Sequence, residues 1–164
     1  MGTQKVIIFK VRGTIQGQKV ISLIDTGATH NFIDAQYVAK RGLQTEEQAR
    51  FRVMVANGDK LLCTQKISNL HIRFGDGYEL KDEFYVVDMG DYDVILGMVW
   101  MASLVEFTLN LAKLEMKFQH EGRTVVLRGH SNGSCRVVSL RRMQILFRHN
   151  NIEWTEKCFT MPTS

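Results

Sequence analysis

The sequence has few cysteines, which would form disulfides or bind zinc, and no long apolar run that would anchor it in a membrane. Its three cysteines, Cys63, Cys135 and Cys158, include no C-x-x-C pair, so we expect neither a disulfide framework nor a structural zinc site. No apolar run reaches the roughly 18 residues of a membrane-spanning helix, and no apolar signal segment follows Met1. These absences predict an intracellular protein in a reducing compartment, with no membrane contact.

Several common catalytic patterns are missing as well. The five histidines show no metal-ligand spacing, no Gly-x-Ser-x-Gly segment is present, and the glycines near the N-terminus form no phosphate-binding loop. No residue next to a cysteine suggests a thiol protease. We therefore expect chemistry without a metal and without a cofactor.

The positive charge is concentrated in the C-terminal part of the chain. The whole chain carries a formal charge of +4, yet five basic and only two acidic residues lie from His130 onward. Residues 130–134 have the composition of a linker, and weak helical spacing follows at Val137, Leu140, Met143 and Phe147. We interpret this tail as a solvated extension. A nucleic-acid contact is the alternative, but interleaved aromatic residues are missing, so nucleic acid is not an expected partner.

The rest of the chain has the pattern of an all-β protein. Short apolar or alternating runs predict strands near residues 5–11, 20–24, 51–55, 61–63, 70–74, 84–87, 94–96, 105–111, 114–118 and 125–127. The Asn57-Gly58 pair predicts a projecting hairpin. Only two short helices are expected, at residues 33–40, with Asn31 as N-cap and Gly42 as C-cap, and at 98–104. This pattern favours a small closed or orthogonally folded β-barrel.

The segment that carries chemistry is Asp25-Thr26-Gly27, which follows the apolar strand at residues 20–24. Such a strand removes water from a carboxylate at its end and raises its pKa. The Thr26 hydroxyl can bond across a tight turn, and Gly27 lets a backbone or a substrate approach closely. Taken alone, the triplet is more typical of an ordinary turn after a strand.

Two further segments add to this motif. Residues 23–33 (LIDTGATHNFI), Ala56-Asn57-Gly58 and residues 92–100 (YDVILGMVW) follow one another in order. Together they resemble the retropepsins, the aspartic proteases of retroviruses and LTR retrotransposons, and most closely the protease region of gypsy-type plant retrotransposon polyproteins. The resemblance covers about residues 5–129. It predicts a retropepsin-like protease domain at 1–129 and leaves 130–164 as a basic C-terminal extension or linker of unknown structure.

The resemblance implies an aspartic endopeptidase that works as a homodimer on polypeptide substrates. Because the chain has one Asp-Thr-Gly, the second catalytic aspartate would be Asp25 of another chain, with Thr26 and Gly27 supporting the pair. The hairpin at Gly58 would close over the cleft as a flap. The residues that this resemblance assigns to substrate binding are Ala28, Thr29, His30, Ala56, Asn57, Gly58, Asp59 and Ile95.

Three other functions stay open at this point. The chain could be a catalytically degenerate dimerisation or peptide-binding module of the same fold, or a host enzyme such as the protease domain of ubiquitin-shuttle proteins. A nucleic-acid-binding domain that uses the basic tail is the third. For the protease reading, polyprotein processing in the cytoplasm, the nucleus or virus-like particles is the expected setting.

Overall fold

The computed structural model describes residues 5–54, 60–75, 77–90, 92–129, 136–139, 144–149 and 153–157. Its two short helices are α1 (Ala35–Arg41) and α2 (Met98–Ser103). Its strands are β1 (Lys5–Ile15), β2 (Gln18–Asp25), β3 (Phe32–Asp34), β4 (Glu46–Met54), β5 (Lys60–Phe74), β6 (Glu79–Val87), β7 (Val94–Leu96), β8 (Thr108–Asn110), β9 (Glu115–His120), β10 (Arg123–Arg128), β11 (Arg136–Ser139), β12 (Gln144–His149) and β13 (Glu153–Lys157). The expected mainly β architecture with two short helices is confirmed.

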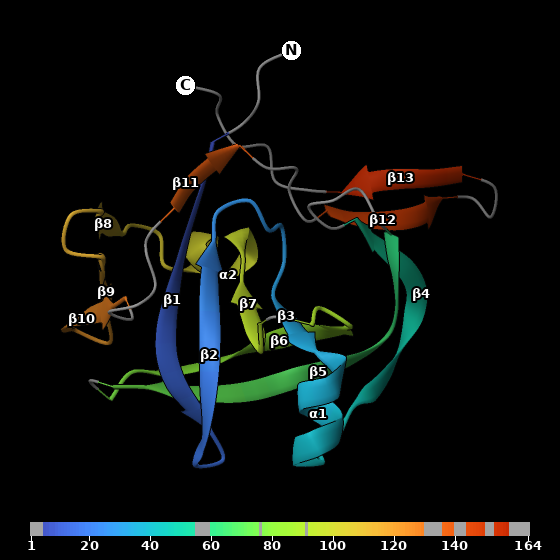
Figure 1. The fold of residues 1–164 in the computed structure, drawn as a ribbon, viewed down its shortest axis with the longest axis horizontal. Helices are drawn as coiled ribbons and strands as arrows, with labels where there is room; N and C mark the ends of the chain where they lie inside the picture. Colours follow the sequence, from blue (N-terminus) through green and yellow to red (C-terminus); the bar gives the residue numbers. More distant parts are fainter. Residues whose placement is uncertain are drawn as a thin grey trace.

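Six strands form a closed ring, as the sequence led us to expect. The main sheet runs β1-β2-β7-β3-β6-β5-β4, and β1 also pairs with β5 (Figure 1). This extra pairing joins Gly13 to Phe74 and Thr14 to Arg73, which closes the ring. A Cβ at Gly13 would lie 2.9 Å from the Arg73 carbonyl oxygen, so only glycine lets the two strands meet this closely. Within the ring, β2–β7 and β3–β6 are parallel pairs.

The main core fills the ring and continues beneath a second, three-stranded sheet of β8, β9 and β10. Trp100 of α2, only 2% exposed, lies edge-on to Phe118 of β9, and its indole N–H donates to the Tyr78 hydroxyl at 3.3 Å. The small sheet therefore packs onto α2, the helix that follows β7. Figure 1 shows this sheet to one side of the β1–β2 hairpin.

Helix α1 differs from its prediction at the N-terminus and agrees at the C-terminus. Asp34, not Asn31, is the N-cap, and its carboxylate accepts a hydrogen bond from the Tyr37 N–H. Ile33 belongs to β3, because its partners Val94 and Val86 draw it into the ring. Gly42 has φ 62° and ends the helix in the left-handed conformation, as expected.

Two further expectations need correction. The strand predicted at 105–111 is reduced to β8, because Val105 adopts φ 68° directly after α2 and turns the chain away from an extended path.

In the tail, the described residues are strands where helical spacing was expected. The strand β11 pairs with β1, and β12 pairs with both β4 and β13, because the edges of the main sheet leave backbone groups for them to bond.

Replacing Val105 by glycine should stabilise the protein by about 1 kcal/mol. A β-branched residue with positive φ costs about 1–2 kcal/mol, and the entropy cost of glycine offsets only part of the gain. Val105 is 89% exposed, so little packing is lost. Urea denaturation measures the effect. Glu106→Gly, at an exposed neighbour without positive φ, is the control and should destabilise; an equal loss at Val105 would contradict the assigned conformation.

Candidate active site

Asp25 lies at the C-terminal end of β2, where the strand leaves the ring. The preceding residues pair with β1 on one side and with β7 on the other, so the chain is fixed up to this point. Asp25 is 8% exposed, and its Oδ1 accepts a hydrogen bond from the Gly27 N–H at 2.7 Å. Burial raises the pKa of Asp25 from 3.8 to about 6, while the N–H groups of Gly27 and Ala28 oppose that rise.

Such a carboxyl group can be protonated or ionised near neutral pH. An ordinary aspartate is fully ionised there, whereas a group with a pKa near 6 can both accept and return a proton. The cause is the apolar setting. Leu23, two residues earlier on β2 and therefore on the same face as Asp25, belongs to a second buried cluster with Ala28, Phe32 and Ile95. The sequence-based expectation of a desolvated carboxylate agrees with this geometry.

The segment after Gly27 is clamped by the start of α2. The Met98 N–H donates to the Ala28 carbonyl at 2.8 Å, and the Val99 N–H donates to the Thr29 carbonyl at 3.1 Å. Gly97 makes this approach possible, because a Cβ there would lie 2.7 Å from the Ala28 carbonyl oxygen. Two stretches of chain about seventy residues apart thus form one rigid unit beneath Asp25.

Two further predicted residues, His30 and Ile95, border this segment. Ile95 is 3% exposed and pairs with Leu23 on β2 and with Phe32 on β3. His30 is half-buried; its Nδ1 lies 2.8 Å from Thr29 Oγ1, and its ring meets the edge of Tyr85 at 5.9 Å. Burial, together with Glu83, raises the pKa of Tyr85 to about 12, so this phenol stays neutral.

The structure brings most of the predicted site residues together. Asp25, Thr26, Gly27, Ala28, Thr29, His30 and Ile95 form one connected region around the end of β2. Ala56, Asn57, Gly58 and Asp59 lie outside the described residues. The strands that flank them are paired as the hairpin requires, from Arg52 with Leu62 to Met54 with Lys60. The flap and the substrate contacts of these residues stay predictions.

One residue of this region escaped the sequence reasoning. Asn31 was assigned to a helix cap, but its amide group instead reaches the backbone of Gly97 and of Glu83. Its position three residues after Ala28 gave no signal of this role, because the bonded groups lie 66 and 52 residues further along the chain.

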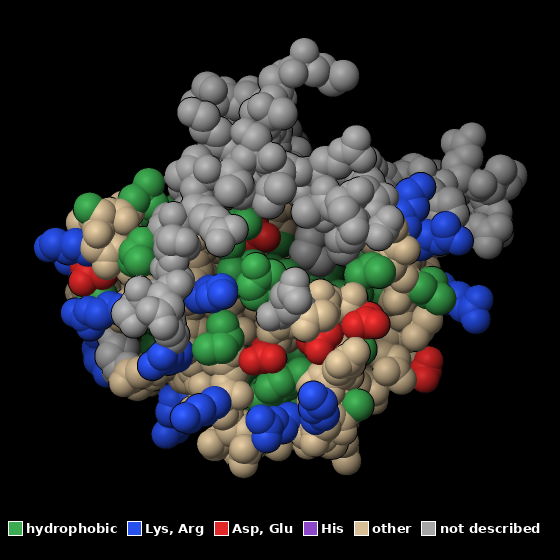
Figure 2. Space-filling view, viewed as in Figure 1, with side chains coloured by type: hydrophobic (Ala, Val, Ile, Leu, Met, Phe, Trp, Pro, Cys, Tyr) green, Lys and Arg blue, Asp and Glu red, His purple; other side chains and the backbone are tan. Residues whose placement is uncertain are grey.

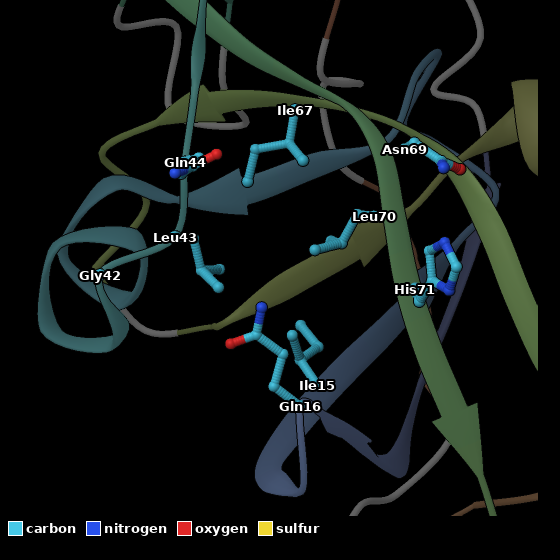
Figure 3. Close-up of a pocket in the computed structure, with 9 residues that line it drawn as sticks. All are labelled: Ile15, Gln16, Gly42, Leu43, Gln44, Ile67, Asn69, Leu70 and His71. Carbon is cyan, nitrogen blue, oxygen red and sulfur yellow. The ribbon is translucent and has the colours of Figure 1, made fainter.

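A cavity on the surface of the protein lies apart from Asp25. A cavity of about 660 Å³ lies beside the end of α1, with Ile15, Leu43, Ile67 and Leu70 among its lining (Figure 3). It includes no residue of the Asp25 region. Among the described residues, no three His, Cys, Asp or Glu side chains gather as a metal site, and no helix is long and apolar enough to cross a membrane.

The charges on the face shown in Figure 2 are mixed. Lys and Arg side chains lie mostly along its margin, with acidic and hydrophobic side chains nearer the middle. A nucleic-acid-binding surface has a continuous basic stripe or patch instead. The described residues of this face therefore give no support to a nucleic-acid interface.

Comparisons with known proteins identify the family and the fold class of this chain. The family model described as Retroviral aspartyl protease matches residues 3–123. The retroviral protease-like domain of Ddi1 from Leishmania major is 17% identical over 75% of this chain and 94% of that chain, with a TM-score of 0.59. A retropepsin-like aspartic protease from Rickettsia conorii is 19% identical over 64% and 91% of the two chains, with a TM-score of 0.46. Among curated proteins nothing matches. The expected retropepsin-like fold class is confirmed.

Proposed function

The chain belongs to the retroviral aspartyl protease family, and from that premise we propose that it is an aspartic endopeptidase. The observation that carries the proposal is the buried Asp25 carboxyl group, whose pKa lies near 6 at the end of an apolar strand. We propose further that two chains associate and that each supplies one Asp25 to a shared active site.

The chemistry follows from placing two such carboxyl groups together. Carboxylates about 3 Å apart cannot both ionise, and the aspartic-protease pair is the standard example of this behaviour. The ionised member takes a proton from a bound water, whose oxygen attacks the peptide carbonyl carbon. The protonated member donates to the carbonyl oxygen, and the resulting tetrahedral species collapses with proton transfer to the leaving amine. Apparent pKa values belong to the pair and not to one chain.

The proposed substrate is an extended polypeptide. The backbone at Gly27, Ala28 and Thr29 borders Asp25, and a peptide can add to such a segment as a further strand. The hairpin of β4 and β5 would close over it through residues 55–59. Processing of a retrotransposon polyprotein is the biological role that the matched motifs favour. The likeness to the Ddi1 domain supports the fold only and is also compatible with a host protease.

Activity should fall faster than linearly when the protein is diluted. The described residues of one chain contain a single Asp-Thr-Gly segment, at Asp25, so only a dimer would hold a complete catalytic pair. The measurement is cleavage of an unfolded protein over a concentration series, with sedimentation at the same concentrations. A rate per chain that stays constant down to concentrations where sedimentation finds only monomer would rule out the shared site.

A further inference from the structure

We propose that Asn31 is a positioning residue for Asp25, and that it acts by fixing the β7–α2 junction against the segment that follows the catalytic residue. The inference rests on the proposed function, since it concerns the geometry of the same site. The hydrogen bonds of Asn31 run to Glu83, Gly97 and Tyr85, so its effect on Asp25 is indirect.

The side chain of Asn31 joins three elements from a buried position. It is 1% exposed, its Oδ1 accepts the Gly97 N–H at 3.0 Å, and its Nδ2 donates to the Glu83 carbonyl at 3.3 Å. The Asn31 carbonyl also accepts the Tyr85 N–H at 3.0 Å. One residue therefore ties the segment after Asp25 to β6 on one side and to the end of β7 on the other.

These bonds bear on Asp25 through the clamp described above. Gly97 is followed by Met98 and Val99, whose N–H groups hold the carbonyls of Ala28 and Thr29. The Ala28 N–H in turn donates to the Asp25 backbone carbonyl at 3.2 Å. A shift of Gly97 is therefore passed to the backbone that carries the catalytic carboxyl group. A misplacement of about 1 Å can reduce a rate about 100-fold.

Only an amide of this length satisfies both partners. Asparagine offers an acceptor to Gly97 and a donor to Glu83 at the same time. An ionised aspartate keeps the acceptor but has no donor for the Glu83 carbonyl, and leucine of similar size has neither. An unpaired buried backbone group is unfavourable, so the junction should relax away from its position when the amide is lost.

The experiment compares Asn31→Leu and Asn31→Asp with Leu127→Ala in the full chain. Leu127 is 2% exposed on β10, in the three-stranded sheet, so its truncation destabilises the fold without touching the Asp25 segment. We expect kcat to fall about 100-fold for Asn31→Leu and less for Asn31→Asp, with KM within about threefold of wild type. Leu127→Ala should keep the wild-type kcat below its melting temperature.

A second readout does not depend on turnover. NMR titration of the Asp25 carboxyl carbon should show a pKa moved away from its wild-type value in both Asn31 variants and unmoved in Leu127→Ala. If wild type cleaves nothing, the proposed function fails, and this titration still decides the role of Asn31. Wild-type kcat and carboxyl pKa in the Asn31 variants would overturn the inference. Failure of both Asn31 variants to fold, while Leu127→Ala folds, would also overturn it by making Asn31 a purely structural residue.

Discussion

Asp25→Asn should remove essentially all turnover and, at neutral pH, make the folded chain more stable than wild type. An amide cannot take a proton from water, and general acid–base catalysis is worth at least about 100- to 10,000-fold. The substitution is nearly isosteric, so the buried position at the end of β2 remains filled. The first measurement is cleavage of an unfolded protein by both forms at equal concentration.

The stability effect follows from the pKa of the buried carboxyl group. The folded chain holds the Asp25 proton up to about pH 6, whereas the unfolded chain releases it near pH 3.8. Between these values the folded state binds more protons, so its unfolding free energy decreases as pH rises through that window. Wild type should therefore lose about 2–3 kcal/mol relative to Asp25→Asn between about pH 4 and pH 7.

Urea denaturation of both forms at the two pH values tests this expectation, because the other titrating groups cancel in the difference. A second carboxylate brought close in a dimer would enlarge the effect by repulsion. Near wild-type turnover by purified Asp25→Asn would remove the proposed mechanism. A stability difference that does not change with pH would show that Asp25 is not desolvated in the folded chain.

Gly97→Ala should disrupt the site, because the methyl group that it adds has no room. The new Cβ would lie 2.3 Å from the His30 carbonyl oxygen and 2.7 Å from that of Ala28. Both atoms are backbone, so neither can rotate away as the end of a side chain would. Overpacking of this kind costs about 1–3 kcal/mol, and moving the segment beside Asp25 should lower activity about 100-fold.

Gly75→Ala is the matched control for this substitution. Its Cβ would meet nothing within 4 Å, and Gly75 has no positive φ, so stability and cleavage should match wild type. Thermal unfolding and cleavage rates measure both variants. If Gly97→Ala retained full activity with an unchanged melting temperature, the close packing of the β7–α2 junction on the Asp25 segment would be wrong.

The local parts of the site could be predicted from the sequence, because they depend on neighbouring residues. The apolar residues before Asp25 predict the strand that buries it, and Gly42 predicts the end of α1. The Val94–Leu96 run with Gly97 after it likewise predicts β7 and the start of α2. Each of these features depends only on residues within a few positions of it in the sequence.

The predictions that were wrong mostly concern residues whose partners lie far away in the sequence. The role of Asn31 needs Gly97, 66 residues later, and the assignment of Ile33 to β3 needs both β6 and β7. The left-handed conformation of Val105 could not be predicted, because β-branched residues rarely adopt this conformation. The alternation of apolar residues around Val105 favoured a strand instead. Single-sequence patterns do not contain such long-range information.

The parallel pairing of β2 with β7 also has a consequence for how the protein folds. Ser22 meets Val94 and Ile24 meets Leu96, so a loop of about seventy residues must close before this pairing forms. Non-local pairs of this kind slow folding and form late. A chain emerging from the ribosome therefore cannot assemble the Asp25 segment until α2 has been synthesised. The proposed proteolytic activity therefore requires the chain to be synthesised at least through the end of α2.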